Sequence, residues 1–183
     1  MTLKELNRIE LGELANNIPK GHVGEFTAFA GKEHYRLLNH LCEGKKLVYD
    51  IGTYKGVSSI AMSNAKKVIS YNVENQLEVK KLKNITYKLG ESMADENILK
   101  AELIVLDTYH DGDYENAFYQ FLRRNDYKGI LVLDDIHLNK EMERFWSSII
   151  EPKDDLTSIG HYTGTGLVYF GGTKRLTRCK SCG

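Results

Sequence analysis

Two short polar stretches of the sequence contain residue types that could activate a hydroxyl group. The first runs from Asp107 to His110, and the second is the pair Asp134 and Asp135. Three carboxylates offer the hard oxygen ligands that Mg²⁺ takes in proteins. A metal ion bound to an alcohol stabilises the alkoxide, and a histidine, whose ordinary pKa is about 6.5, accepts the proton. The two stretches are therefore candidates for a metal-assisted reaction at a hydroxyl, although aspartates also cap helices and form turns.

A glycine-containing run from Asp50 to Ser59 is the second candidate site. Its pattern is D-x-G-x-x-x-G, with Gly52 suited to a sharp turn and Gly56 to the start of a helix. It differs from the G-x-G-x-x-G of dinucleotide-binding proteins and lacks the Gly-Lys-Ser/Thr of a phosphate-binding loop. The acid at Asp50 favours a cationic or hydrogen-bonding ligand over a pyrophosphate.

The elements that must position these residues follow from the hydrophobic pattern. Short apolar runs alternate with helical segments, which predicts a parallel sheet buried on both faces. The expected strands are 46–51, 68–71, 85–89, 103–106 and 129–133, and the expected helices are 3–17, 35–41, 57–64, 75–82, 114–124 and 140–150. Two final runs, 156–160 and 166–170, predict an antiparallel hairpin. The fold class is therefore a doubly wound, three-layer α/β fold with a mostly parallel sheet.

Polar residues follow each expected strand, where ligands bind in such sheets. Asp50 ends the first, Asn72 the second, and Gly90-Glu91-Ser92 follow the third. Asp107 and Asp134 follow the fourth and fifth, so we expect the two acidic stretches to meet at one edge of the sheet.

In its glycine turn the sequence resembles class I S-adenosylmethionine (SAM)-dependent methyltransferases. Their first motif, an acid followed by G-x-x-x-G, is matched by Asp50, Gly52 and Gly56. Their second strand normally ends in an acid that holds the ribose; here Asn72 stands at that position and Glu74 follows two residues later, and both are candidates.

The third strand is followed by a segment that resembles the Gly-x-Ser segment near the adenine in that family. The resemblance spans 46–171 and implies a Rossmann-like methyltransferase fold with SAM as the cofactor. The cofactor-binding residues that it implies are Asp50, Gly52, Thr53, Tyr54, Gly56, Ser58, Asn72, Glu74, Gly90, Glu91, Ser92 and Asp107.

The acidic stretches resemble two metal-dependent O-methyltransferase groups. Catechol O-methyltransferases have an Asp followed three residues later by a Lys, and then an Asp-Asn pair. Macrolide-sugar O-methyltransferases of the macrocin and mycinamicin type have Asp-x-x-His and then Asp-Asp, which Asp107, His110, Asp134 and Asp135 match. This closer resemblance implies Mg²⁺ or Mn²⁺ bound by the three aspartates, His110 as the general base assisted by Asp107, and a sugar hydroxyl as the acceptor. A catechol-like phenol is the alternative acceptor.

Charge and hydrophobicity limit the classes of binding partner that we expect for this protein. The chain has 183 residues and a formal net charge of zero, so it has no global field to attract nucleic acid, and no apolar run is long enough for a membrane helix. We expect a cytoplasmic protein with a small-molecule or glycan-terminal acceptor. Cys42 reads as a core residue, and Cys179 and Cys182 lie in a polar tail. The expected organisation is N-terminal helices and a lid over 1–44, the catalytic core over 45–173, and a flexible tail over 174–183.

Other residues carry weaker expectations. His137 and Asn139 either contact substrate or cap the next helix, and the linker 161–166 either faces substrate or forms a tight connection. Glu115 and the aromatic residues near it read as packing, and His22, His34 and His40 receive no role. Two competing functions are a non-catalytic nucleotide-binding domain of this fold and an NAD oxidoreductase, the latter weakened by the missing G-x-G-x-x-G.

Overall fold

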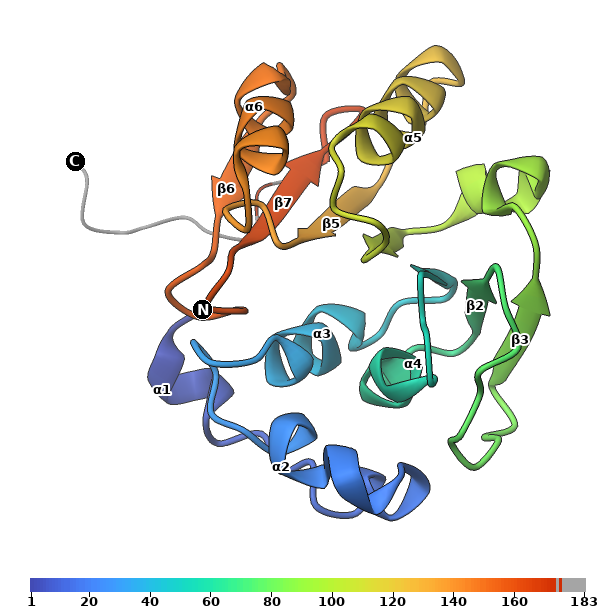
Figure 1. The fold of residues 1–183 in the computed structure, drawn as a ribbon, viewed down its shortest axis with the longest axis vertical. Helices are drawn as coiled ribbons and strands as arrows, with labels where there is room; N and C mark the ends of the chain where they lie inside the picture. The colour runs from blue at the N-terminus through green and yellow to red at the C-terminus, as the bar shows by residue number, and fades with distance from the viewer. Residues whose placement is uncertain (174, 176–183) are drawn as a thin grey trace.

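A seven-stranded sheet forms the centre of the computed structural model, which describes residues 1–173 and 175 (Figure 1). The strands are β1 Val48–Ile51, β2 Val68–Asn72, β3 Ile85–Leu89, β4 Leu103–Leu106, β5 Ile130–Asp134, β6 Lys153–Asp155 and β7 Thr165–Tyr169. They lie in the order β3-β2-β1-β4-β5-β7-β6, with β1 to β5 parallel and β7 antiparallel to both β5 and β6. The predicted doubly wound sheet with an antiparallel C-terminal pair is confirmed.

Helices cover both faces of the sheet and bury two separate cores. On one side lie α1 Leu3–Leu6, α2 Val23–Phe26, α3 Tyr35–Cys42 and α4 Val57–Ala61, and on the other α5 Asp113–Arg124 and α6 Lys140–Ser148 (Figure 1). Alternate residues of one strand serve the two cores: Val105 packs on the α3 and α4 side, whereas Ile104 and Leu106 pack on the α5 and α6 side. This double burial explains why the strands are continuous apolar runs.

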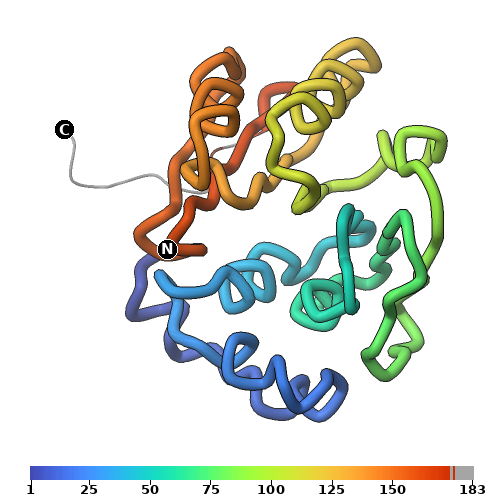
Figure 2. Tube along the Cα trace, viewed as in Figure 1, coloured from blue at the N-terminus to red at the C-terminus, as the bar shows by residue number. Residues whose placement is uncertain are grey.

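The N-terminal segment lies along the outside of α3 and α4 (Figure 2) and differs from the predicted helix over 3–17. A capping box between Thr2 and Glu5 begins α1, but the helix ends at Leu6, and a 3₁₀ turn follows at Leu14–Asn17. The buried guanidinium of Arg36 donates hydrogen bonds to carbonyl groups of this segment and the next, those of Ile9, Thr27 and Ala28. These carbonyls are satisfied without a helix, so the apolar spacing alone overestimated the helix length.

Two other elements also differ from prediction. Residues 75–82 form no helix; Leu77 and Val79 of this stretch pack instead against Gly56. The first strand of the hairpin is β6 rather than 156–160, because the chain turns after Leu156, whose carbonyl accepts hydrogen bonds from the amides of Ile159 and Gly160. The remaining 3₁₀ turns are Lys20–His22, Met62–Asn64, Ser92–Ala94 and Glu96–Lys100.

Cys42 is buried in the core on the α3 and α4 side, as expected. Cys179, Cys182 and the predicted tail, apart from Arg175, lie outside the described residues. Across 1–173 and 175, no helix combines the length and the apolar character that crossing a bilayer requires.

Candidate functional site

A cavity of about 560 Å³ opens at the carboxyl ends of β1, β2 and β3, beside the end of β4. Its walls include eight of the twelve predicted cofactor-binding residues, namely Gly52, Tyr54, Asn72, Glu74, Gly90, Glu91, Ser92 and Asp107. The sheet therefore brings the strand-end residues together as the topology predicts. The other four, Asp50, Thr53, Gly56 and Ser58, do not line this cavity, and Thr53 lines a smaller neighbouring one.

Gly52 is required by the close approach of two strand ends. Its φ is +92°, and a Cβ built at this position would lie 1.6 Å from the carbonyl oxygen of Asp107. The turn after β1 and the turn after β4 therefore touch backbone to backbone, which only glycine allows.

Asp50 lies beneath the turn rather than in the cavity. Its carboxylate is fully buried and accepts hydrogen bonds from Ser58 at 3.0 and 3.1 Å and from Ser70 at 3.1 Å. Burial raises the pKa of Asp50 to about 6, although these hydroxyls favour the charged form. Asp50 and Ser58 thus hold the start of α4 against β1 and β2, and their direct contact with a ligand stays a prediction.

The cavity is also lined by aromatic side chains, most of which the positions after the strands do not predict. Tyr71, Tyr109 and Tyr114 join Tyr54 around it, and Tyr114 donates a hydrogen bond to Glu91 at 2.9 Å. The rings of Tyr109 and Tyr114 meet edge to face, with centroids 5.9 Å apart. The sequence signal for them was the position of Tyr109 between two candidate residues and of Tyr114 at the start of an aromatic helix.

Within the described part of the chain, the buried hydroxyl of Ser92 lacks the hydrogen-bond partner that buried polar groups normally have. It forms no hydrogen bond of normal geometry with a described residue, although it interacts with the hydroxyl of Tyr114; Ser92 is 1% exposed and lines the cavity. A buried polar group without a partner is costly, so this hydroxyl fits a site that a polar ligand completes.

His110 lies between two of the predicted acids. Its Nε2 is 3.2 Å from Oδ1 of Asp107 and 3.4 Å from Oδ2 of Asp135, while its buried Nδ1 has no hydrogen-bond partner among the described residues. Burial opposes the charged imidazolium, but the carboxylates of Asp107 and Asp135 outweigh it and raise the pKa of His110 above 6.5. The arrangement stabilises a proton on this ring.

The backbone around His110 is fixed from two helices. Its amide donates to the buried carboxylate of Glu115 on α5, which also accepts from Thr108 and the amide of Gly112. Its carbonyl accepts from Asn139, whose own side chain caps α6. The sequence predicts a packing role for Glu115, and the structure shows instead that its carboxylate anchors the loop after β4.

Three residues at the ends of three strands adopt left-handed backbone angles without being glycine. Tyr54 follows β1, His110 follows β4 and Asp135 follows β5, with φ of 47°, 54° and 58°. Such angles cost about 1–3 kcal/mol each and occur preferentially at functional sites. Three of the four described non-glycine residues with positive φ thus lie at one edge of the sheet, and the fourth, Asp126, lies in an exposed turn; the clustering supports this edge as the candidate site.

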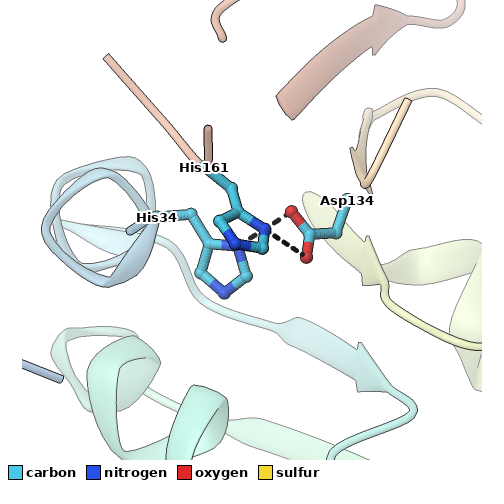
Figure 3. A group of neighbouring side chains, drawn as sticks. All are labelled: His34, Asp134 and His161. Carbon is cyan, nitrogen blue, oxygen red and sulfur yellow. Dashed lines mark hydrogen bonds and ion pairs between the residues drawn. The ribbon is translucent and has the colours of Figure 1, made fainter. Parts of the chain in front are cut away.

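Both carboxylate oxygens of Asp134 face histidine rings. Its Oδ1 lies 3.0 Å from Nδ1 of His34, and its Oδ2 lies 3.2 Å from Nδ1 of His161 (Figure 3). The predicted metal set of Asp107, Asp134 and Asp135 is therefore not confirmed. The one group of possible metal-ligating side chains that the described part of the chain brings together is His34, Asp134 and His161.

The two histidines have strongly raised basicity. Burial lowers the pKa of His34, but the charge of Asp134 and its hydrogen bond outweigh this and raise the pKa to about 9. Burial likewise opposes the charge on His161, but Asp134, Asp135 and Glu33 raise its pKa to about 11. The same pairs hold the pKa of Asp134 well below its usual range, although burial alone would raise it.

The remaining candidates have structural partners. His137 pairs with Asp155 at 2.8 Å, and Asn139 caps α6, so for Asn139 the capping interpretation is confirmed. The linker 161–166 brings His161 beside Asp134 and Thr163 beside Asp135, to which the Thr163 hydroxyl donates a hydrogen bond. His34 and His161 were missed because the chain brings them to Asp134 from 100 and 27 residues away, which local spacing cannot reveal.

Comparisons with known proteins give structural likeness only. No family model and no curated protein matches the sequence. A methyltransferase from Geobacter sulfurreducens is 13% identical, with 89% of this chain and 92% of that chain covered at a TM-score of 0.59. The O-methyltransferase from Bacillus cereus in complex with S-adenosylhomocysteine (SAH) is 14% identical, with 92% and 90% covered at 0.54. The SAH-bound methyltransferase PaMTH1 from Podospora anserina is 13% identical, with 84% and 89% covered at 0.55. The sheet order and these likenesses establish that the chain has the fold of the class I SAM-dependent methyltransferases.

Proposed function

We propose that the chain is a SAM-dependent O-methyltransferase that acts on a hydroxyl of a small-molecule or glycan-terminal acceptor. The observation that carries the proposal is that one residue, Asp107, belongs both to the wall of the 560 Å³ cavity and to the acid pair around His110. A cavity large enough for a nucleoside cofactor thus adjoins a proton acceptor. The methyltransferases of the same fold support the cofactor, since two of them were solved with SAH.

The cavity residues fit the parts of SAM. Asn72 and Glu74, at the end of β2, offer an amide and a carboxylate to ribose hydroxyls, and the buried hydroxyl of Ser92 offers a hydrogen bond to the base. Tyr54 and Tyr71 supply aromatic surface. When bound, SAM supplies a methyl group on a positively charged sulfur, which needs no further activation.

His110 is the proposed general base. It accepts the acceptor's hydroxyl proton, and the imidazolium so formed is stabilised by Asp107 and Asp135 at 3.2 and 3.4 Å. Because these acids raise the pKa of His110 above 6.5, the fraction of neutral, base-competent His110 increases as the pH rises through that raised pKa. The rate should therefore increase from pH 6 towards alkaline pH.

The Mg²⁺ ion that the resemblance implies does not fit the donor set. Magnesium sites are built from oxygen ligands, whereas each oxygen of Asp134 faces an imidazole nitrogen and Asp107 faces His110. The proposed proton transfer therefore runs through His110 and its acid partners alone.

The acceptor proposed first is a sugar hydroxyl, and the alternative is a catechol-like phenol. Support for the sugar comes from the Asp107, His110, Asp134 and Asp135 pattern, which resembles the macrolide-sugar enzymes more closely than the catechol enzymes. The competing function, a nucleotide-binding domain without catalysis, predicts the same cavity but no dependence on His110.

The test combines cofactor binding with turnover. Calorimetry should detect binding of SAM and SAH but not NAD, and methyl transfer from labelled SAM should be assayed on glycosides and catechols in parallel. His110→Gln should lower the rate by roughly 10²–10⁴ with little change in SAH affinity. His40→Gln, on the exposed end of α3, is the matched control and should leave both unchanged.

The outcomes separate the alternatives. SAH binding without transfer to any acceptor class would favour the binding domain, and an unchanged rate in His110→Gln would remove His110 as the base. Absence of SAH binding would reject the proposed function altogether.

A further inference from the structure

Three side chains from distant parts of the chain converge beside the proposed base. His34 precedes α3, Asp134 ends β5, and His161 lies in the β6–β7 connection; we call them the His-Asp-His cluster (Figure 3). One ligand atom of each lies within 4.8 Å of those of the other two. We propose that the His-Asp-His cluster binds a divalent first-row transition metal ion such as Zn²⁺.

The spacing of the cluster suits such an ion. Nδ1 of His34 and Nδ1 of His161 lie 3.0 and 3.2 Å from the two oxygens of Asp134. Ligands bound at about 2.0–2.2 Å to one Zn²⁺ are separated from each other by roughly 3 Å, so the same atoms need only small shifts to surround it. Both rings already turn the same nitrogen towards the carboxylate.

The charges also favour a metal over a pair of imidazolium ions. The rings of His34 and His161 are 5.6 Å apart, edge to face, and both compete for Asp134. Two cationic rings at this distance repel each other, and His34 and Asp134 are each 5% exposed, so little water screens them. Two neutral imidazoles that share one dication avoid this repulsion and keep the charge of Asp134 compensated.

A second layer of contacts supports the cluster. Metal-binding histidines usually direct their other ring nitrogen towards a carboxylate or carbonyl. Nε2 of His161, the nitrogen that would not bind the ion, lies 3.8 Å from Glu33. The hydroxyl of Thr163 lies 3.0 Å from Nδ1 of the same ring and would have to give up this contact when the ion binds. Asp135, next along the chain from Asp134, lies 3.2 Å from His161 and is a candidate fourth ligand.

The donor types identify the class of ion. Two imidazole nitrogens and a carboxylate suit Zn²⁺, Co²⁺, Fe²⁺ or Ni²⁺, whereas Mg²⁺ takes oxygen ligands. The proposed nitrogen-containing site differs from the predicted magnesium site in its two histidines and shares with it Asp134 and the candidate fourth ligand Asp135. It does not depend on methyl transfer, because metal binding is measured directly.

The experiment uses the full chain with Cys179→Ser and Cys182→Ser as the background, since the C-x-x-C thiols would bind Zn²⁺ themselves. After treatment with a chelator, the protein is titrated with Co²⁺ and followed by its visible absorption, and then with Zn²⁺ in competition. We expect one equivalent to bind, Zn²⁺ to displace Co²⁺, and millimolar Mg²⁺ to displace neither.

Three variants locate the ion. His34→Gln and His161→Gln should each weaken Co²⁺ binding by more than the roughly 10–100-fold that a second-shell change costs. His40→Gln should bind Co²⁺ as the background does, since this ring lies at the far end of α3. Circular dichroism and urea denaturation show whether each variant has folded.

Failure of this proposal is distinct from failure of the proposed function. If the background protein binds no Co²⁺, or if folded His34→Gln and His161→Gln bind it unchanged, the cluster is an ion-paired group only and the proposal is wrong. SAH binding in the same samples tests the cofactor cavity separately.

Discussion

Gly52 is the residue on which the contact between β1 and β4 depends. Substituting alanine places a Cβ 1.6 Å from the Asp107 carbonyl oxygen at a backbone φ of +92°. The backbone strain alone costs about 1–3 kcal/mol, and the clash adds to it. We therefore expect Gly52→Ala to lose more than about 3 kcal/mol of unfolding free energy, measured by urea denaturation.

A matched control separates strain from clash. Gly44 also has a positive φ, +73°, but a Cβ there would meet nothing within 4 Å. Gly44→Ala should cost only about 1 kcal/mol. Equal losses in the two variants would argue against the backbone contact. Because Gly52 meets Asp107 before it meets a ligand, a bulky residue here disturbs the fold as well as the cofactor cavity.

Residue types alone predicted much of the site but not the partners of each residue. Gly52, Asn72, Ser92 and Asp107 were found from their positions after strands, and the cavity includes them. The grouping of Asp134 with His34 and His161 was not predictable, because it depends on how the N-terminal segment and the β6–β7 connection close over β5.

At the scale of elements, Glu115 links α5 to the loop that carries His110. Its carboxylate is 1% exposed and accepts three hydrogen bonds, from Thr108, His110 and Gly112. Glutamine keeps the shape but turns one acceptor into a donor, so at least one of these groups loses its partner. We expect Glu115→Gln to cost about 1–3 kcal/mol and to lower turnover through the position of His110.

The appropriate comparison is an exposed acid in a first helical turn. Glu143→Gln on α6 should change the unfolding free energy by less than about 0.5 kcal/mol. Urea denaturation gives the loss of stability in the two variants, and kcat measured beside the SAH affinity shows whether turnover falls while cofactor binding is kept. If Glu115→Gln were as mild as Glu143→Gln, the loop would not depend on this carboxylate.

The strands and long helices were predictable because the apolar pattern of each segment is enough to determine its secondary structure. Apolar runs buried on both faces gave β1, β2, β4 and β5, whereas β3 lies at the edge of the sheet and is only partly buried. The apolar stripes of α5 and α6 gave their extents to within one or two residues. The segments 3–17 and 75–82 have similar apolar spacing but pack through tertiary contacts, with Arg36 in one case and Gly56 in the other. Local periodicity cannot distinguish these from helices.

At the scale of the whole molecule, Asp50 makes stability depend on pH. Its folded pKa, about 6, lies above the ordinary value of 3.8, because burial disfavours the charged form. The folded protein therefore holds this proton more tightly than the unfolded chain, so this group's contribution to stability falls as the pH rises from about 4 to 6. From the shift, the loss is on the order of 2–3 kcal/mol.

Asp50→Asn removes this titration while keeping the shape. Unfolding free energies of both proteins should be measured by urea denaturation at pH 4 and pH 7. The wild type should lose stability relative to Asp50→Asn across this range, whereas Asp126→Asn, at an exposed turn, should give the wild-type slope. Parallel curves for the wild type and Asp50→Asn would contradict a raised pKa.

The left-handed residues Tyr54, His110 and Asp135 have a consequence for how this protein can be improved or can evolve. At each of them glycine would relieve the backbone, so a search for heat resistance would reward replacing the very side chains that the proposed chemistry uses. Screens for thermal tolerance should therefore be paired with a screen for turnover. Without it, the selected variants will be thermostable proteins that lack the side chains of the proposed reaction.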